Sequence, residues 1–533
     1  MLHSESRQSG TKDSGALIIA LLTACLLLLT GCYDAAHPSR KIISLDDFSE
    51  LKTDEYALNA LLIQENLEHI SHTDLDRSYA ATHTQDYYRQ GGTMVWIDYQ
   101  TVDDRADTLL AILEARLSAI GFKQQPFNLA QIREDVERMR SLQFDKTNNI
   151  NLVAARLEYN LSKAYLRYVA GQRFGFVNPS HVLNHLEIRE QDSTKRFPTY
   201  RQLYDVTIER PNSHYLQQAL ACATRDNLGN YLRQAEPSDS LYLRLQKMLP
   251  LADDSRRQQI LVNMERCRWR DTLKIAPKEK HVIVNVPAFQ LWAVSPDSTI
   301  EMRVVCGNVK TKTPLLSSRI TYMQVNPEWM IPMSIIRNEV APHSGDSSYF
   351  ARNRYYIADR ETGVQLEPSN VTARMLRSGR YRVVQKGGAG NSLGRIVFRF
   401  PNNFSVFLHD TSSPGAFGRD NRGVSHGCVR VQRPFDLAVF LMEREPDLQM
   451  LDKLRISMGM KPETDWGIEQ LDKLDPEEEC PTLIRTISVS PRVPIIITYY
   501  TIFLTPDGVI QYYPDIYGYD KAIAEALKTY TDD

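Results

Sequence analysis

Residues 281–294, with the sequence HVIVNVPAFQLWAV, determine the fold expected for the second half of the chain. Apolar and polar residues alternate over 281–286, which is typical of a β-strand with one buried face. The short apolar run 290–294 follows a proline-containing turn and predicts the partner strand of a hairpin. Turn residues separate further expected strands at 302–305, 321–325, 395–400 and 405–408. Residues 281–435 are therefore expected to form a β-rich domain.

A long polar stretch, residues 338–394, interrupts this β-rich domain. One helical piece is expected near 371–377, and the glycine cluster at 387–390 is expected to act as a hinge. Insertions of this length inside a compact domain are usually functional, for example as lids over a site. The glycine cluster lacks the lysine and the following helix of a phosphate-binding loop. We therefore expect a lid, and no cofactor.

The chain before the β-rich domain has the pattern of a helical protein. Apolar residues recur every three or four positions over 104–115 and 152–169, as they do on the buried face of a helix. We predict an all-helical scaffold over 41–275, and an α+β fold for the whole chain. Downstream, the sequence predicts a helix at 435–442, an acidic loop region at 446–490, a hairpin that pairs 494–501 with 509–512, and a final helix at 521–527.

Composition and charge exclude several classes of protein. A chain of 533 residues is too long for one hydrophobic core, and at about 150 residues per domain it indicates about two to four domains. Hydrophobic residues make up 42% of the chain, which excludes wholesale disorder. The 63 basic residues are balanced by 65 acidic ones, so the chain lacks the one-sided field of a nucleic-acid-binding protein. No nucleic acid partner is expected.

The N-terminal residues have the pattern of an export signal. A polar segment, 1–13, precedes an uncharged and mostly apolar run of fifteen residues at 16–30. This run is short for a bilayer span, which takes about 20 residues, and it fits the core of a signal peptide. It ends in Leu29-Thr30-Gly31-Cys32, which resembles the lipobox of bacterial lipoproteins. The resemblance implies that residues 1–32 are a signal peptide and lipobox, and that a lipid on Cys32 anchors the protein to a membrane in the periplasm; an uncleaved N-terminal anchor is the alternative.

The remaining cysteines do not form a metal or disulfide framework. Cys222, Cys267, Cys306, Cys428 and Cys480 are odd in number, and no two have the CxxC spacing of a zinc ribbon. An unpaired thiol is a liability in an oxidising compartment, so we expect at least one of them to be kept for its chemistry.

Two stretches concentrate reactive side chains: FLHDT at 407–411 and SHGCVR at 425–430. His409 ends an expected strand and Cys428 follows nineteen positions later. A thiol attacks as a thiolate, and a neighbouring imidazole lowers its pKa by forming a thiolate–imidazolium pair. Gly427 allows close backbone approach for an oxyanion hole, and Arg430 suits a substrate carboxylate. The pattern indicates acyl transfer through a thioester.

Two other interpretations of the same residues remain open at this point. A cysteine near histidines is often only a packed core residue. His409, Asp410, His426 and Cys428 are also all of the types that bind metals. A metal site is disfavoured because adjacent residues on a strand, such as His409 and Asp410, point to opposite faces.

The 425–430 motif, preceded by His409, resembles the signature of L,D-transpeptidases with a YkuD-type catalytic domain. The large periplasmic members are also similar at 284–289, 312–314, 325–327 with Trp329, 394–400, 264–266 with Trp269, 515–518, 88–89 and Trp96. The resemblance implies a helical scaffold at 41–275 and a β-rich YkuD-like catalytic domain at 281–457 with the capping insertion 338–394. A C-terminal hairpin and helix at 458–533 are then expected to pack on the catalytic domain.

The resemblance also implies a reaction and residue roles. Cys428 would attack the carbonyl of the third residue of a peptidoglycan tetrapeptide stem, and His409 would move the protons. D-Ala would leave, and the side-chain amine of a second stem would take the acyl group in a 3→3 cross-link. Gly427 and Cys428 amides would hold the oxyanion, and the carbonyl of Asp410 would orient His409. The implied substrate contacts are Arg430, Ser425 and Asp410. Tetrapeptide stems would be both donor and acceptor, and other wall-synthesis proteins would be further partners. Cys428 would be acylated by carbapenems, and no metal is implied.

The sequence departs from the large periplasmic members at two points. The position of His426 is often Ser in those members, so His426 either tunes the thiolate or hydrogen-bonds its own loop. Only about a dozen residues separate Leu249 from the expected helix at 263–269, which leaves no room for a separate peptidoglycan-binding module. The motif leaves alternatives open: an L,D-carboxypeptidase or papain-like wall endopeptidase that uses water as acceptor, or an inactive wall-binding scaffold.

Overall fold

The computed structural model describes residues 56–97, 102, 104–190, 198–224, 228–442, 446–475 and 481–532. The expected signal peptide and lipobox lie outside the described residues. The chain forms two compact units. The first contains the described residues up to Leu110 together with Asn128–Ala164, and the second contains Ala111–Phe127 and the described residues from Tyr165 onward. Each unit is described by itself. Among the described residues, no helix is both long enough and apolar enough to cross a membrane.

The first unit is helical. Its elements are α3 (Ala60–Thr73), α4 (Tyr79–Arg89), the first part of α5 (Asp104–Ala119), α6 (Leu129–Ser141) and the first part of α7 (Ile150–Phe174). A buried carboxylate, Glu158 of α7, accepts hydrogen bonds from the backbone N–H groups of residues 95–97 and from the hydroxyl of Tyr88. Burial raises the pKa of Glu158. These bonds explain why Tyr88 and Trp96 stand out in the sequence: they belong to one buried polar cluster that fixes the loop after α4.

The second unit begins with helices and then builds a sheet. Its first helices are α8 (Pro179–Leu183), α9 (Ser213–Ala223), α10 (Leu228–Ala235), α11 (Ser240–Met248) and α12 (Asp254–Arg268). On α12, Glu265 and Arg268 form a buried ion pair at 3.1 Å. Glu265 also accepts hydrogen bonds from the indole of Trp269 and the N–H of Val177. Paired, hydrogen-bonded charges of this kind are expected at buried positions.

The larger part of the second unit is a sheet that closes on itself. Along it the strand order is β12-β13-β15-β6-β5-β4-β16-β7-β3, and β12 also pairs with β7. The bounds are β3 (Tyr204–Asp205), β4 (His281–Asn285), β5 (Gln290–Val294), β6 (Thr299–Gly307), β7 (Leu315–Val325), β12 (Ile396–Arg399), β13 (Leu408–His409), β15 (Val429–Val431) and β16 (Thr486–Thr498), with β14 (Gly423–Ser425) beside β6. The predicted hairpin forms as β4 and β5, with Ile283 opposite Trp292.

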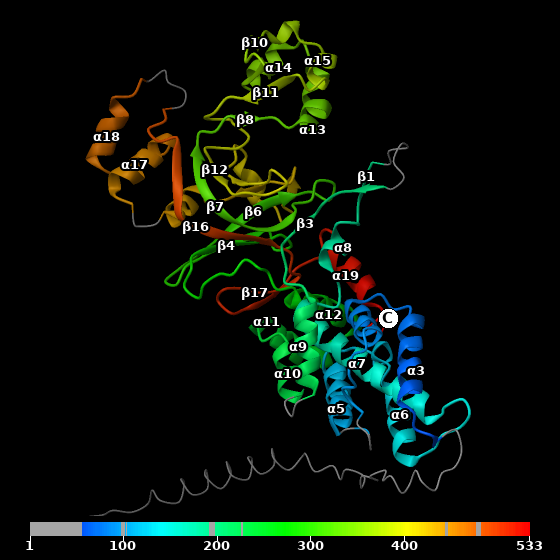
Figure 1. Cartoon of the computed structure of the whole chain (residues 1–533). Coiled ribbons are helices and arrows are strands. Elements are labelled where there is room, and N and C mark those ends of the chain that lie inside the picture. Colours follow the sequence, from blue (N-terminus) through cyan, green and yellow to red (C-terminus); the bar gives the residue numbers. More distant parts are fainter. Residues whose placement is uncertain are drawn as a thin grey trace, which may run out of the picture. The chain divides into compact units, whose positions relative to one another are not determined.

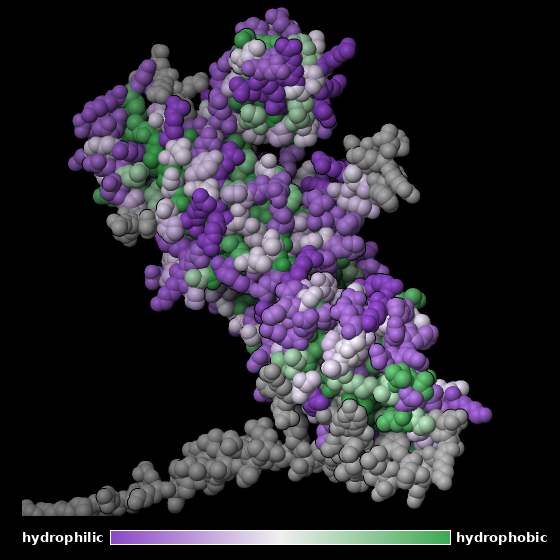
Figure 2. All heavy atoms as spheres, in the orientation of Figure 1, coloured by the Kyte–Doolittle hydropathy of each residue, from purple (hydrophilic) through white to green (hydrophobic). Residues whose placement is uncertain are grey.

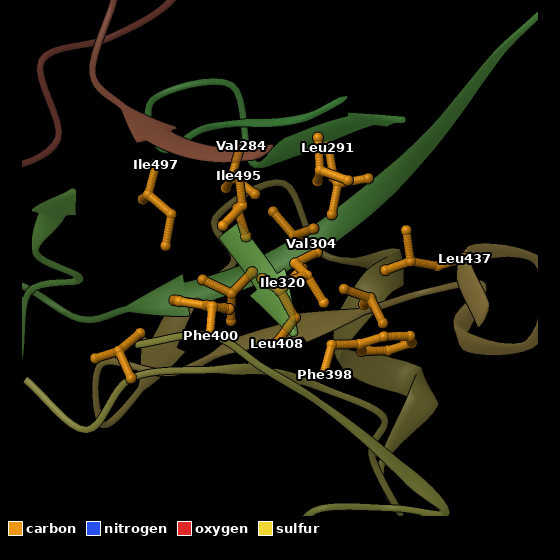
Figure 3. Close-up of a cluster of buried hydrophobic side chains, with 14 of the residues drawn as sticks. Val284, Leu291, Val304, Ile320, Phe398, Phe400, Leu408, Leu437, Ile495 and Ile497 are labelled. Carbon is orange, nitrogen blue, oxygen red and sulfur yellow. The ribbon is translucent and has the colours of Figure 1, made fainter. Parts of the chain in front are cut away.

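The core lies inside this closed sheet. Figure 3 shows side chains from the sheet strands and from α16 (Pro434–Leu441) directed toward one another. The labelled residues are all buried: Val284, Leu291, Val304, Ile320, Phe398, Phe400, Leu408, Leu437, Ile495 and Ile497. Because Leu408 is part of this core, the strand that ends in His409 is held by apolar packing from within.

The C-terminal strand differs from the sequence prediction. The predicted hairpin of 494–501 with 509–512 is wrong, because β16 lies between β4 and β7 in the main sheet. The hairpin is formed instead by β17 (Ile502–Leu504) and β18 (Ile510–Tyr512). The physical reason is that Val493, Ile495 and Ile497 are buried in the core of the main sheet, a burial that a two-stranded hairpin outside the sheet would not provide. The last helix, α19 (Tyr519–Leu527), follows.

Two further expectations need correction. The region 41–275 is not all helical, because it contains β1 (Ile188–Glu190), β2 (Thr199–Tyr200) and β3, which pairs in parallel with β7. The acidic stretch 446–490 is not mainly loop, since it contains α17 (Leu448–Ser457) and α18 (Asp465–Asp472). Its polar residues start helices: Asp447 accepts the N–H of Met450, and Thr464 accepts the N–H of Gly467.

The insertion forms a folded subdomain together with residues 329–337, so the subdomain begins before the predicted start at residue 338. It contains a four-stranded sheet in the order β10-β9-β11-β8 (Figure 1), made of β8 (Trp329–Met330), β9 (Tyr355–Asp359), β10 (Gln365–Leu366) and β11 (Tyr381–Gln385). Its helices are α13 (Met333–Ile335), the π-helical turn η4 (Ile336–Val340), α14 (Ser347–Arg352) and α15 (Ala373–Arg377). A small core that includes Phe350, Ile357 and Val383 holds it together. Figure 2 shows a mostly hydrophilic surface over it.

Candidate active site

The two reactive stretches meet on neighbouring parallel strands. β13 pairs with β15 so that Leu408 lies opposite Val429 and His409 lies opposite Arg430. Leu408 and Val429 are fully buried in the core. Because successive side chains on a strand point to opposite faces, His409, Arg430 and Cys428 project together from the other face. The structure thus brings the predicted nucleophile and base together, with Arg430 beside them.

The thiol of Cys428 is half-buried and free. Burial raises its pKa, and this is opposed by the backbone of Phe407 and by the guanidinium groups of Arg399 and Arg430. The side chain of Arg399 stacks over the ring of Phe407, 4.3 Å from its centroid. The sequence analysis missed Arg399, because nothing in its local pattern shows that the end of β12 lies near the thiol of Cys428.

The imidazole of His409 is buried, with 4% of its surface exposed. Burial, reinforced by the charge of Arg430, lowers its pKa to about 3, against the opposing effect of the backbone of Asp410 and Leu393. Within the described residues its Nδ1 has no hydrogen-bond partner at bonding distance, while the backbone of Asp410 still raises the pKa of the ring; the orienting role of the Asp410 carbonyl stays a prediction. These pKa directions describe a neutral thiol beside a neutral imidazole, and not the thiolate–imidazolium pair expected from the sequence.

The turn before Cys428 is fixed by Ser425. The hydroxyl of Ser425 donates to the carbonyl of Cys428 at 2.6 Å and accepts the N–H of Gly427 at 3.1 Å. Gly427 has φ 119°, a conformation that favours glycine and curls the turn back onto Ser425. The expected free N–H of Gly427 is therefore already bonded, and Ser425, expected to bind substrate, is directed into its own loop.

A second layer of hydrogen bonds supports this turn. The hydroxyl of buried Thr313 donates to the carbonyl of Gly427 at 2.9 Å and accepts the N–H of Gly307 at 2.8 Å. The phenol of Tyr517 donates to the carbonyl of Gly307 at 2.6 Å and accepts the N–H of Thr313 at 3.2 Å. Thr311 donates to the carbonyl of Ser425 at 2.7 Å. The resemblance had marked 312–314 and 515–518, and the structure shows that both clamp the motif.

The side chain of Asp410 also serves the fold. One carboxylate oxygen accepts the N–H of Arg395 at 2.8 Å, and a Cβ on Gly394 would come within 2.4 Å of this carboxylate. Asp410 was expected to bind substrate, but its carboxylate instead holds the turn that leads into β12. Among the described residues, no three His, Cys, Asp or Glu side chains are grouped so as to hold a metal ion.

His426 points away from the turn. Its side chain is about half exposed, and Nε2 lies 3.2 Å from Oε1 of Glu339 on η4 of the insertion. Neither sequence interpretation of His426 included this partner. This contact joins the motif loop to the subdomain that contains the insertion, and no local sequence pattern reveals it.

Comparisons with known proteins agree with this arrangement. Residues 279–447 match the family model of the L,D-transpeptidase catalytic domain, YkuD, and residues 82–249 match that of the Scaffold domain. A Haemophilus influenzae protein described as "Putative L,D-transpeptidase" is 26% identical over 326 residues, which is 59% of this chain and 60% of that protein. The chain thus aligns with about three-fifths of this relative.

A solved structure, an L,D-transpeptidase from Mycobacterium smegmatis, is 13% identical, with a TM-score of 0.18 over 42% of this chain and 59% of that one. The two matched family models, and the signature residues that fall within the first of them, carry the assignment. The chain therefore contains a YkuD L,D-transpeptidase catalytic domain preceded by a Scaffold domain, and it is homologous to the Haemophilus influenzae protein described as "Putative L,D-transpeptidase".

Proposed function

We propose that the protein is a peptidoglycan L,D-transpeptidase that forms 3→3 cross-links through a thioester on Cys428. The observation that supports this proposal is the pairing of β13 with β15, in which His409 lies opposite Arg430, two positions after Cys428, within the matched catalytic domain. A wall-binding scaffold without activity would need neither a thiol nor an imidazole at this place.

In the first half-reaction, Sγ of Cys428 attacks the carbonyl carbon of the third residue of a tetrapeptide stem. His409, which its low pKa keeps neutral, takes the thiol proton as the bond from Sγ to the carbonyl carbon forms. The N–H of Cys428 is our candidate for an oxyanion donor. The C–N bond to D-Ala then breaks, His409 returns the proton to the departing amine, and a thioester remains.

In the second half-reaction, a side-chain amine of another stem attacks the thioester carbonyl. His409 takes a proton from this amine, the new amide forms, and the thiolate of Cys428 leaves and recovers the proton. Arg430 lies opposite His409 in the strand register, so we place it on the side of the departing D-Ala, where it meets the terminal carboxylate.

A carboxypeptidase or endopeptidase would use water in place of the amine. The contact between Glu339 and His426 favours the transpeptidase, because it holds the capping subdomain against the motif loop. A covered site limits the access of water to the thioester. We further propose that a lipid on Cys32 holds the enzyme in the periplasm, where other wall-synthesis proteins are its neighbours.

The test is mass spectrometry of a disaccharide-tetrapeptide after incubation with the enzyme. We expect a dimer that lacks one D-Ala, and none with Cys428→Ala. Cys222→Ala removes another half-buried thiol and is the matched control, which should stay active. Tripeptide monomer alone would establish water as the acceptor. A failure to form either product, together with no carbapenem adduct on Cys428, would overturn the catalytic proposal.

A further inference from the structure

A cavity of about 650 Å³ opens beside the motif loop, and the established domain match assigns it no role. Its walls come from three parts of the second unit: residues 187–189 and 201–205 around β1 to β3, residues 310–314 after β6, and residues 403–406 before β13. His426 and Gly427 line the side nearest Cys428. Residues 187–205 belong to the matched Scaffold domain, so this domain supplies part of the wall.

The strand register fixes where the cavity lies relative to the reacting groups. β13 and β15 are parallel, and the lining residues Val406 and Gly427 precede them at the same end. His409 is the last residue of β13 and is paired with Arg430, two positions after Cys428. The cavity and His409 therefore lie on opposite sides of Cys428 along the strand direction.

Positive charge predominates in the cavity. Arg189, Arg201, Lys310 and Lys312 line it, against the acidic residues Glu187 and Asp205. These lining charges fall into two groups, which differ in whether the side chain has a polar partner within the cavity wall.

The first group is engaged within the wall. Glu187 accepts from Arg201 at 3.2 Å and from Lys312 at 2.7 Å. Arg201 also donates to the backbone carbonyls of Lys310 and Lys312. Asp205 accepts from Asn403 at 2.9 Å. These contacts make Arg201 and Lys312 structural members of the wall.

The second group is Lys310 and Arg189. Both side chains are exposed, and in the part of the chain that the structure describes neither forms an ion pair. Beside them Phe404 and Val406 give the cavity an apolar portion. Two uncommitted cations next to an apolar surface are suited to an extended peptide with free carboxylates.

We propose that this cavity binds the carboxylate-bearing part of the donor stem, on the N-terminal side of the carbonyl that Cys428 attacks. This inference rests on the proposed function. The departing amine and the incoming amine both exchange a proton with His409, so both lie on its side of Cys428. The rest of the donor continues from the attacked carbonyl to the other side, where the cavity begins. Lys310 and Arg189 meet its carboxylates, and the Scaffold segment thereby takes part in donor recognition.

The experiment measures D-Ala release by the full chain from two donors, a disaccharide-tetrapeptide with free side-chain carboxylates and the same compound with these carboxylates amidated. The variants are Lys310→Glu and Arg189→Glu. The matched control is Lys461→Glu, which reverses an exposed charge outside the cavity lining. Carbapenem acylation of Cys428 is followed by mass as a readout of the thiol itself.

Each cavity variant should raise the KM for the free-carboxylate donor about tenfold, as expected for the loss of one charge-assisted contact. The KM for the amidated donor, the carbapenem rate and the control should change less than about twofold. An unchanged KM for the free donor, or an equal rise for both donors, would overturn the inference.

Failure of the proposed function gives a different result. If the wild-type chain takes a carbapenem but releases no D-Ala, the proposed reaction fails, and the cavity is then tested by titrating Cys428→Ala with a fluorescent tetrapeptide. Binding that weakens in Lys310→Glu, and not in Lys461→Glu, would keep the cavity assignment. Equal binding by Cys428→Ala alone and by its combinations with Lys310→Glu and Lys461→Glu would overturn the cavity assignment.

Discussion

Thr313→Val tests whether the hydrogen-bonded clamp, and not the motif alone, holds the nucleophile. Valine has nearly the same shape as threonine, but it removes the hydroxyl that bonds the carbonyl of Gly427 and the N–H of Gly307. Thr313 is fully buried, so both backbone groups are left without these partners. Leaving a buried polar group unsatisfied costs about 1–3 kcal/mol. We therefore expect the free energy of unfolding to fall by about 2–4 kcal/mol.

The same change should slow acylation, because Gly427 directly precedes Cys428. A turn that loses its clamp no longer holds the thiol in one geometry, and small misplacements of reacting groups cost up to about a hundredfold in rate. Stability is measured by urea unfolding, and acylation by the mass of the carbapenem adduct under native conditions. Thr362→Val removes an exposed hydroxyl in the capping subdomain and is the control, with an expected change below about 0.5 kcal/mol.

The reasoning would be refuted if Thr313→Val had a free energy of unfolding within about 0.5 kcal/mol of the wild type, the usual range for surface substitutions, and were acylated at the same rate. A stability loss without a rate loss would show that the clamp supports the fold and does not position Cys428. The two measurements therefore separate the structural claim from the catalytic one.

Three further predictions follow from the site and the sheet. Because burial holds the pKa of His409 at about 3 and raises that of Cys428, the acylation rate should stay flat between about pH 5 and pH 8, and an acid limb centred near 6.5 would contradict the neutral pair. Glu339→Gln removes the charge that faces His426, so we expect the ratio of hydrolysed to cross-linked product to rise severalfold in the mass spectrum; an unchanged ratio would mean that this contact does not keep water out. A fragment of residues 279–457 lacks β16, whose five core residues contribute about 1.5–3 kcal/mol each. Their sum is comparable to the whole stability of a typical domain, so the fragment should show no cooperative unfolding transition by circular dichroism. A sharp two-state transition from this fragment would show that β16 is dispensable.

The sequence predicted the elements whose signals are local. The β4–β5 hairpin follows from the alternation over 281–294, and the junction of His409 with Cys428 follows from a motif that lies at strand ends. The placement of β16 could not be predicted, because alternation shows that a strand has a buried face but does not show which strands lie beside it. The pairing of β3 with β7 and the contact of Glu339 with His426 are long-range in the same sense.

Residue roles within the site were less predictable than residue positions. Ser425, Asp410 and Gly427 were expected to meet the substrate, yet their polar groups bond within the protein. A motif records which residue types occur together, whereas the hydrogen-bond partner of each depends on loops elsewhere in the chain, here on Thr313 and Tyr517. Supporting residues of this kind have no local pattern of their own, and only the folded sheet brings them to the motif.

The charges around Cys428 account for both halves of the proposed reaction. Burial raises the pKa of the resting thiol and so favours its protonated form, which is less open to oxidation than a thiolate. The second half-reaction needs a stable leaving thiolate, and Arg399 and Arg430 favour that form from β12 and β15, the two strands that flank β13. Arg430 also lowers the pKa of His409, which keeps the resting imidazole neutral but makes it a weaker base. The same cation thus stabilises the thiolate and disfavours the imidazolium, so we expect the proton to leave Cys428 only as the thiol attacks the substrate carbonyl.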